Sequence, residues 1–156
     1  APLVDGDKLL VQVGGYPDAK VVAFDKRTGR ELWRALSGEH APGFSPLIII
    51  NAGGTRQLVA WDIAGVSALD PQTGTVYWQI PWPLTQLSNA VTPVQAGSLL
   101  YFSSFYNGSL MLQLDEQKPA ARIFWKGRSN SEVVTDALRA FIATNEKNRA
   151  AKGGES

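Results

Sequence analysis

The sequence contains no cysteine, which excludes disulfide frameworks, thiolate metal sites and cysteine nucleophiles. It also lacks any apolar run approaching about 18 residues, so no segment is predicted to span a membrane. Positive and negative side chains nearly cancel, with 15 Lys and Arg against 14 Asp and Glu. Such a balance gives no overall attraction for nucleic acid, and the one basic group, Lys26, Arg27 and Arg30, lies inside a predicted turn.

What the sequence does contain is an internal repeat. An Asp recurs every 45 residues, at Asp25, Asp70 and Asp115. A Trp follows each Asp, at spacings of 45 and then 47 residues, as Trp33, Trp78 and Trp125. A proline opens each unit, at spacings of 44 and 47 residues, as Pro2, Pro46 and Pro93. A fixed period of this length is typical of repeat architectures.

Each unit is predicted to form four short strands. In the second unit the strands are Ser45 to Ile50, Arg56 to Trp61, Gly65 to Leu69 and Thr75 to Ile80. They are rich in Val, Ile, Leu, Tyr and Trp, and turn residues separate them. Four strands in every unit of about 45 residues predict an all-β fold of antiparallel β-propeller blades. We expect three blades, at about 1–44, 45–90 and 91–127, which form an incomplete ring.

The recurring Asp and Trp are predicted to have structural roles. Asp can accept hydrogen bonds from the backbone of its own turn, and the Gly of Thr28-Gly29 and Thr73-Gly74 tolerates a positive φ. The third unit has two extra residues and a proline, Pro119, where the glycine is expected. We therefore expect a longer and different turn there. The Trp of each outermost strand is expected to fill the space between neighbouring blades.

Residues 128–156 depart from the repeat, and two interpretations are open. Ser129 and Glu132 are spaced as a capping box, and apolar residues from Val133 to Ile142 share one helical face. This pattern predicts a C-terminal helix that covers an exposed blade. In the other interpretation, residues 139–144 form a strand of a fourth blade. The polar end, residues 145–156, is expected to fray or to be disordered.

The strings AFDKRTGRELW and ALDPQTGTVYW resemble the repeat of the quinoprotein-like (PQQ-like) β-propeller family. The flanking segments are similar to bacterial exported members of that family. The resemblance covers residues 1–127 and implies a periplasmic or otherwise extracytoplasmic location. Propellers close with about 4–8 blades, so three blades imply a larger parent ring or self-assembly. The chain opens with Ala1-Pro2-Leu3 rather than Met, and we expect a processed form or an excised segment.

The resemblance raises the question of a quinone cofactor. Dehydrogenases of the family hold PQQ beside a calcium ion that Glu, Asn and Asp side chains bind. No such set can be matched here motif by motif; Asn89, Asn107 and Asp62 are residues of the right type, but they lie in predicted loops. The sequence therefore predicts no catalytic residue, no metal site and no cofactor, with PQQ and calcium as the alternative. The residues that would bind a cofactor are left unknown.

Two further residues, His40 and Trp82, are candidates for ligand or partner contacts. His40 lies in the connection between the first two blades, and it lacks the companions that a metal site needs. Trp82 lies between Pro81 and Pro83 and could contact a partner, but we expect it to pack as part of a loop core.

The main functional prediction is a non-catalytic scaffold, a module of a larger exported propeller. The alternatives are a fragment of a PQQ-dependent alcohol dehydrogenase-like oxidoreductase, and an extracytoplasmic sensor or carbohydrate-binding propeller. We expect a protein partner, or self-association, through the exposed faces of the end blades. No nucleic-acid partner and no membrane span are expected.

Overall fold

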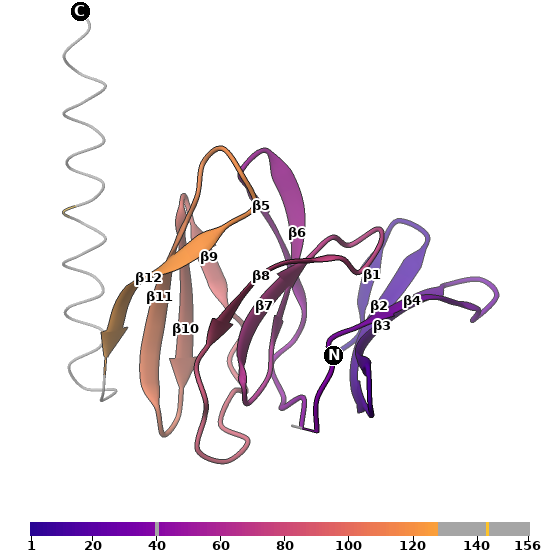
Figure 1. Ribbon diagram of the computed structural model, residues 1–156, viewed down its shortest axis with the longest axis horizontal. Coiled ribbons are helices and arrows are strands. Elements are labelled where there is room, and N and C mark those ends of the chain that lie inside the picture. Colours follow the sequence, from indigo (N-terminus) through magenta and orange to yellow (C-terminus); the bar gives the residue numbers. More distant parts are fainter. Residues whose placement is uncertain (40, 128–142, 144–156) are drawn as a thin grey trace, which may run out of the picture.

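The structure is a computed structural model that describes residues 1–39, 41–127 and 143. Its described part consists of three four-stranded antiparallel sheets that stand side by side (Figure 1). The predicted all-β fold of four-stranded blades is therefore confirmed. The C-terminal helix predicted from Val133 to Ile142 lies outside the described residues.

The strands of each sheet follow one another in sequence. Blade 1 contains β1 (Leu3–Asp5), β2 (Lys8–Gly15), β3 (Ala19–Asp25) and β4 (Glu31–Ala35). Blade 2 contains β5 (Ile48–Ala52), β6 (Thr55–Trp61), β7 (Gly65–Leu69) and β8 (Val76–Pro81). Blade 3 contains β9 (Val94–Ala96), β10 (Leu99–Ser104), β11 (Gly108–Leu114) and β12 (Ala121–Gly127).

Short turns explain why neighbouring strands pair with each other. In every sheet the spatial order equals the sequence order, because each strand turns back on the one before it. The first strand of blade 2 was predicted from Ser45, but it begins at Ile48. Pro46 has no N–H to donate to a ladder, so pairing starts only beyond it.

The repeated Asp residues cap their turns as predicted. Asp25 Oδ1 accepts hydrogen bonds from the backbone N–H groups of Arg27 (2.9 Å) and Thr28 (2.8 Å). Asp115 Oδ1 does the same for Gln117 (2.9 Å) and Lys118 (3.1 Å). In both turns these backbone donors stabilise the carboxylate, and they lower the pKa of Asp25 and of Asp115 below the usual value. The expectation of a longer third turn is wrong, because the N–H of Asp115 donates to Ala120 O just as the N–H of Asp25 donates to Arg30 O.

Two apolar clusters form the core, one at each blade junction. The first joins blades 1 and 2 and includes Leu10, Val21, Leu58 and Leu69, each 0% exposed. The second joins blades 2 and 3 and includes Trp61, Leu100, Phe102 and Leu110 among others. A single blade has apolar side chains on both faces, so stacking the blades is what removes this surface from water.

At the first junction Trp33 fulfils the packing role predicted for the repeated tryptophans. A Cβ added to Gly74 would lie 2.6 Å from Cε3 and 2.9 Å from Cδ2 of the Trp33 ring. The indole of blade 1 therefore lies directly over the glycine of the blade 2 turn, whose φ is +76°. Trp78 belongs to the apolar cluster of the second junction. Its Nε1 donates to Oε1 of Gln57, a buried residue of the same blade, at 2.8 Å.

Turns and connections from different blades gather at one end of the sheets, the lower edge in Figure 1. We call this end the connection rim. It carries the two inter-blade connections, residues 36–47 and 82–93, and the turns at residues 16–18, 62–64 and 105–107. Because segments far apart in the sequence meet here, side chains from different blades can combine into one site at the connection rim.

Candidate functional site

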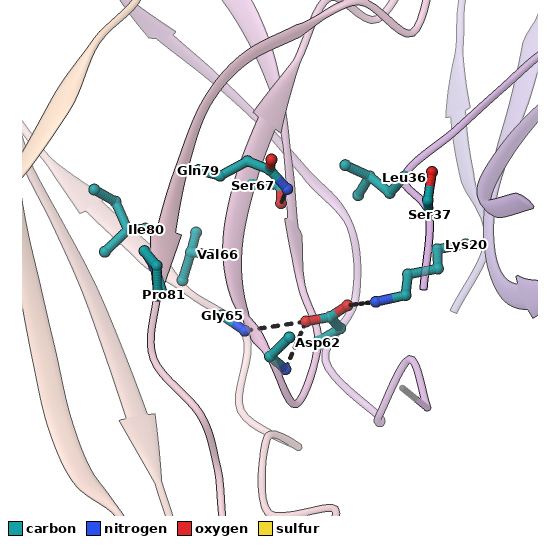
Figure 2. Close-up of a pocket in the computed structure, with 11 residues that line it drawn as sticks. Lys20, Leu36, Ser37, Asp62, Gly65, Val66, Ser67, Gln79, Ile80 and Pro81 are labelled. Atoms are coloured by element: carbon teal, nitrogen blue, oxygen red, sulfur yellow. Dashed lines mark hydrogen bonds and ion pairs between the residues drawn. The ribbon is translucent and has the colours of Figure 1, made fainter. Parts of the chain in front are cut away.

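A pocket of about 280 Å³ opens where blades 1 and 2 meet at the connection rim. The start of β3 and the segment after β4 form one wall, and the β6–β7 turn with β7 and β8 forms the other (Figure 2). The lining residues are Lys20, Leu36, Ser37, Asp62, Ala64, Gly65, Val66, Ser67, Gln79, Ile80 and Pro81. The volume lies just below the range of pockets that enclose drug-sized ligands, about 300–1,000 Å³.

An ion pair crosses the pocket from blade 1 to blade 2. Lys20 Nζ lies 2.6 Å from Asp62 Oδ2, and the two side chains are only 5% and 13% exposed. Figure 2 shows the Lys20 side chain reaching across to the Asp62 turn. The strand that begins at residue 19 positions Lys20, and its backbone N–H also donates to Leu36 O at 3.2 Å.

Asp62 is held in place by its own turn. Its Oδ1 accepts hydrogen bonds from the backbone N–H groups of Ala64 (2.8 Å) and Gly65 (3.0 Å). Gly65 has a φ of +153°, and a Cβ there would collide with the backbone of β8, so glycine is required at this position. With both oxygens engaged, Asp62 is a structural acceptor that clamps two blades rather than a free general base.

A second polar junction lies among the same elements. The side-chain amides of Gln12 and Asn89 both donate to the carbonyl oxygens of Pro42 and Trp61, at 2.8–3.3 Å. These groups come from β2, from β6 and from both inter-blade connections. Gly43 lies against the Asn89 amide so closely that a Cβ there would collide with it. The junction therefore locks both connections onto blades 1 and 2.

The candidate residues named from the sequence do not form one site. Asp62 pairs with Lys20, and the buried Asn89 donates to Trp61 O. Asn107 instead binds the loop at Thr85, where its Oδ1 accepts from the backbone N–H at 2.8 Å. His40 lies outside the described residues.

Trp82 packs inside the molecule, as expected for a loop core. It is 1% exposed and stacks on Trp61, with ring centroids 5.4 Å apart and an angle of 3° between the rings. Phe102 approaches Trp61 edge-on, at 5.3 Å. Each buried indole removes about 150–250 Å² from water, so this group anchors blade 2 to blade 3.

Lys20, Leu36 and Gln12 were not singled out from the sequence. Lys20 and Asp62 are 42 residues apart, and nothing local marks them as partners. Leu36 has a φ of +66°, which is unusual for a residue other than glycine, and it lines the pocket. A lysine at the start of an apolar strand was the one available signal, because a buried lysine needs a partner.

Comparison with known proteins identifies a family and relatives of parts of this chain. A family model described as outer membrane protein assembly factor BamB matches residues 1–151. A curated relative, 1-butanol dehydrogenase (quinone) of Thauera butanivorans, is 32% identical over 88 residues. That match covers 49% of this chain and only 14% of the relative, so the chain spans a small part of that protein's length.

A solved structure shows the same fold. A europium-containing methanol dehydrogenase superposes with a TM-score of 0.51 at 16% sequence identity. The superposition covers 78% of this chain and 24% of that chain. At this identity the likeness concerns the fold alone, and it agrees with the three four-stranded blades.

These relatives correct one prediction. The expectation that no cofactor is involved is wrong, because one relative carries quinone in its name and the other is described as europium-containing. The comparisons also favour the alternative prediction, a dehydrogenase fragment, over the non-catalytic scaffold.

The described residues alone do not fit a complete quinone and metal site. Among them, no group of three or more His, Asp or Glu side chains could hold a metal ion. Lys20, a buried cation, is engaged by Asp62, and the stacked rings of Trp61 and Trp82 are covered.

The described residues also contain no helix with the length and apolar character of a membrane span.

Proposed function

We propose that this chain, which belongs to the family described as outer membrane protein assembly factor BamB, is part of a quinoprotein dehydrogenase-type propeller. In this proposal residues 1–44, 45–90 and 91–127 are three of the blades of a larger ring. The ring binds PQQ and a metal ion and oxidises an alcohol. It works outside the cytoplasm.

The observation that carries the larger ring in this proposal is a difference between two equivalent glycines, whereas the dehydrogenase activity rests on the relatives. Gly74 is covered by Trp33 of the preceding blade, whereas Gly29, at the same place in the blade 1 turn, has nothing within 4 Å of an added Cβ. Both glycines have nearly the same φ, +76° and +71°. The blade 1 turn thus has the shape that receives a tryptophan, and a further blade would supply it.

The outward face of blade 1 supports the same proposal. Leu3 packs into the junction with blade 2, and alternation along β1 directs Val4 to the opposite face. Val4 is 60% exposed, and Val13 of the same blade is 48% exposed. Apolar side chains in this position are what a neighbouring blade would cover.

In this proposal the described blades and the other blades of the ring contribute different parts of the cofactor site. The described blades contribute rigid walls, held by the Lys20–Asp62 ion pair and by the hydrogen bonds that the Gln12 and Asn89 amides donate to backbone carbonyl oxygens. Residues of other blades complete the cofactor site. The curated relative is a dehydrogenase several times longer than the matched segment, which supports this division.

The test uses the full reading frame that contains these 156 residues. The protein is mixed with PQQ and either calcium or a lanthanide, and alcohol-dependent reduction of an artificial electron acceptor is followed. We expect activity that requires both additions, and a thermal midpoint that rises with PQQ concentration. A folded full-length protein that shows neither PQQ binding nor activity would overturn the proposal.

A further inference from the structure

Exposed apolar side chains gather on the connection rim at blades 2 and 3. They are Phe44 (64% exposed), Leu87 (43%), Val91 (51%), Phe105 (72%) and Tyr106 (59%), and we call them the rim patch. They come from the two inter-blade connections and from the β10–β11 turn. Single exposed apolar residues are ordinary, but a group of them on one end of a fold marks an interaction surface.

Hydrogen bonds show that the three contributing segments are neighbours. Ser45 Oγ donates to Val91 O at 3.2 Å, which brings the first connection to the second. The backbone N–H of Phe105 donates to Ser88 O at 3.2 Å, which joins the β10–β11 turn to the second connection. In Figure 1 these segments occupy the same lower edge of the sheets. The rim patch is thus one region made from distant parts of the sequence.

The segments that form the rim patch lack charge. Neither residues 41–55 nor residues 71–114 contain a single Asp, Glu, Lys, Arg or His. An anionic membrane surface is bound through clusters of Lys and Arg, so the rim patch is not built for one. The core of a protein interface, in contrast, is depleted of charge and enriched in aromatic residues.

Three polar residues beneath the rim patch, Ser88, Ser104 and Asn107, are engaged with one another. Ser88 Oγ and Ser104 Oγ are 2.8 Å apart, and Ser104 Oγ accepts from the backbone N–H of Asn107 at 3.3 Å. Asn107 Oδ1 accepts from the backbone N–H of Thr85 at 2.8 Å. A glycan would need free donors and acceptors, which these groups do not offer. The network instead fixes the loops, so the aromatic rings are presented on a preorganised support.

We propose that the rim patch docks a partner protein through an apolar, uncharged segment of that partner. Phe105 and Tyr106 are the anchors, with their rings edge to face at 4.8 Å. This contact is independent of any cofactor in the ring. Because both sides lack charge, binding depends little on salt concentration.

The test pans a phage-displayed random peptide library against the full chain. Recovered peptides are synthesised, and their affinity is measured for the wild type and for the F105S/Y106S variant. Both replaced side chains lie on the surface, and an unchanged thermal midpoint confirms that the variant folds. Tyr16→Ser is the matched control, because Tyr16 is as exposed as Phe105, at 72%, and lies on the same rim in blade 1, outside the rim patch.

We expect the recovered peptides to be rich in apolar residues and poor in charged ones. Their affinity should fall at least about tenfold for F105S/Y106S and stay within about twofold for Tyr16→Ser. Failure to recover peptides, charged consensus sequences, or equal losses in both variants would overturn the proposal. Rim-dependent binding to phosphatidylcholine vesicles or to dextran would also overturn it, in favour of a lipid or a glycan.

Discussion

The indole of Trp33 in blade 1 lies over Gly74 in the blade 2 turn, where a Cβ would be 2.6 Å from ring carbon Cε3. A flat ring and a residue without a side chain thus fit each other across the blade junction. Each of the first two units carries a Trp and a turn Gly at these positions. A contact that joins neighbouring blades thus explains why both residue types recur.

Gly74→Ala is expected to destabilise the chain by about 2–4 kcal/mol. About 1–2 kcal/mol comes from the positive φ, and the remainder comes from overpacking against Trp33. Gly29→Ala is the matched control. Gly29 has a similar φ but open space above it, so only the cost of the positive φ applies. Urea unfolding of both variants measures the difference, and equal losses would contradict the docking contact.

Trp78→Phe is expected to cost about 2–4 kcal/mol. The change leaves a small cavity and removes the 2.8 Å hydrogen bond from Nε1 to Gln57, which is 0% exposed. In a double-mutant cycle with Gln57→Leu, the two losses should not add, since the second change removes the unsatisfied amide oxygen. Strictly additive losses in the free energy of unfolding would show that the hydrogen bond contributes nothing.

Lys20→Met should destabilise the chain by about 3 kcal/mol, because it leaves the carboxylate of Asp62 partly buried without its cation. Adding Asp62→Asn should recover much of this loss. The new amide oxygen can still accept from the N–H groups of Ala64 and Gly65, and no charge remains. Chemical denaturation of the single and double variants tests this, and a stable Lys20→Met protein would contradict the clamp.

The Asp turns predict an acid-sensitive component of stability. Backbone N–H groups lower the folded-state pKa of Asp25 and Asp115, so each contributes stability above the unfolded pKa of about 3.9. This contribution is lost as the pH falls through the lower folded-state pKa. Replacing both by Asn should flatten the loss of stability below about pH 4. An unchanged dependence of the free energy of unfolding on pH, measured from pH 2 to pH 6, would argue against this role of the two Asp turns.

The repeat made the blade architecture predictable, because the Trp and Asp residues recur at a fixed period and a turn Gly stands in each of the first two units. The fate of Trp82 was also foreseen, since a tryptophan between two prolines at a blade end has a core close by. These features depend on local chemistry and on the repeat.

The candidate site was much less predictable. Lys20 meets Asp62 only because β3 of blade 1 starts beside the β6–β7 turn of blade 2. Gln12 and Asn89 likewise share two carbonyl oxygens from separate segments. None of these residues occupies a repeated position, so the period gave no information about them, and only the packing of the blades brings them together.

An experimental structure of the full reading frame that contains this segment tests whether the three blades belong to a larger ring. If the three blades belong to a larger ring, an indole ring from another blade should lie over Gly29 as Trp33 lies over Gly74. A structure in which Gly29 faces solvent, with no neighbouring blade against Val4 and Val13, would contradict the account.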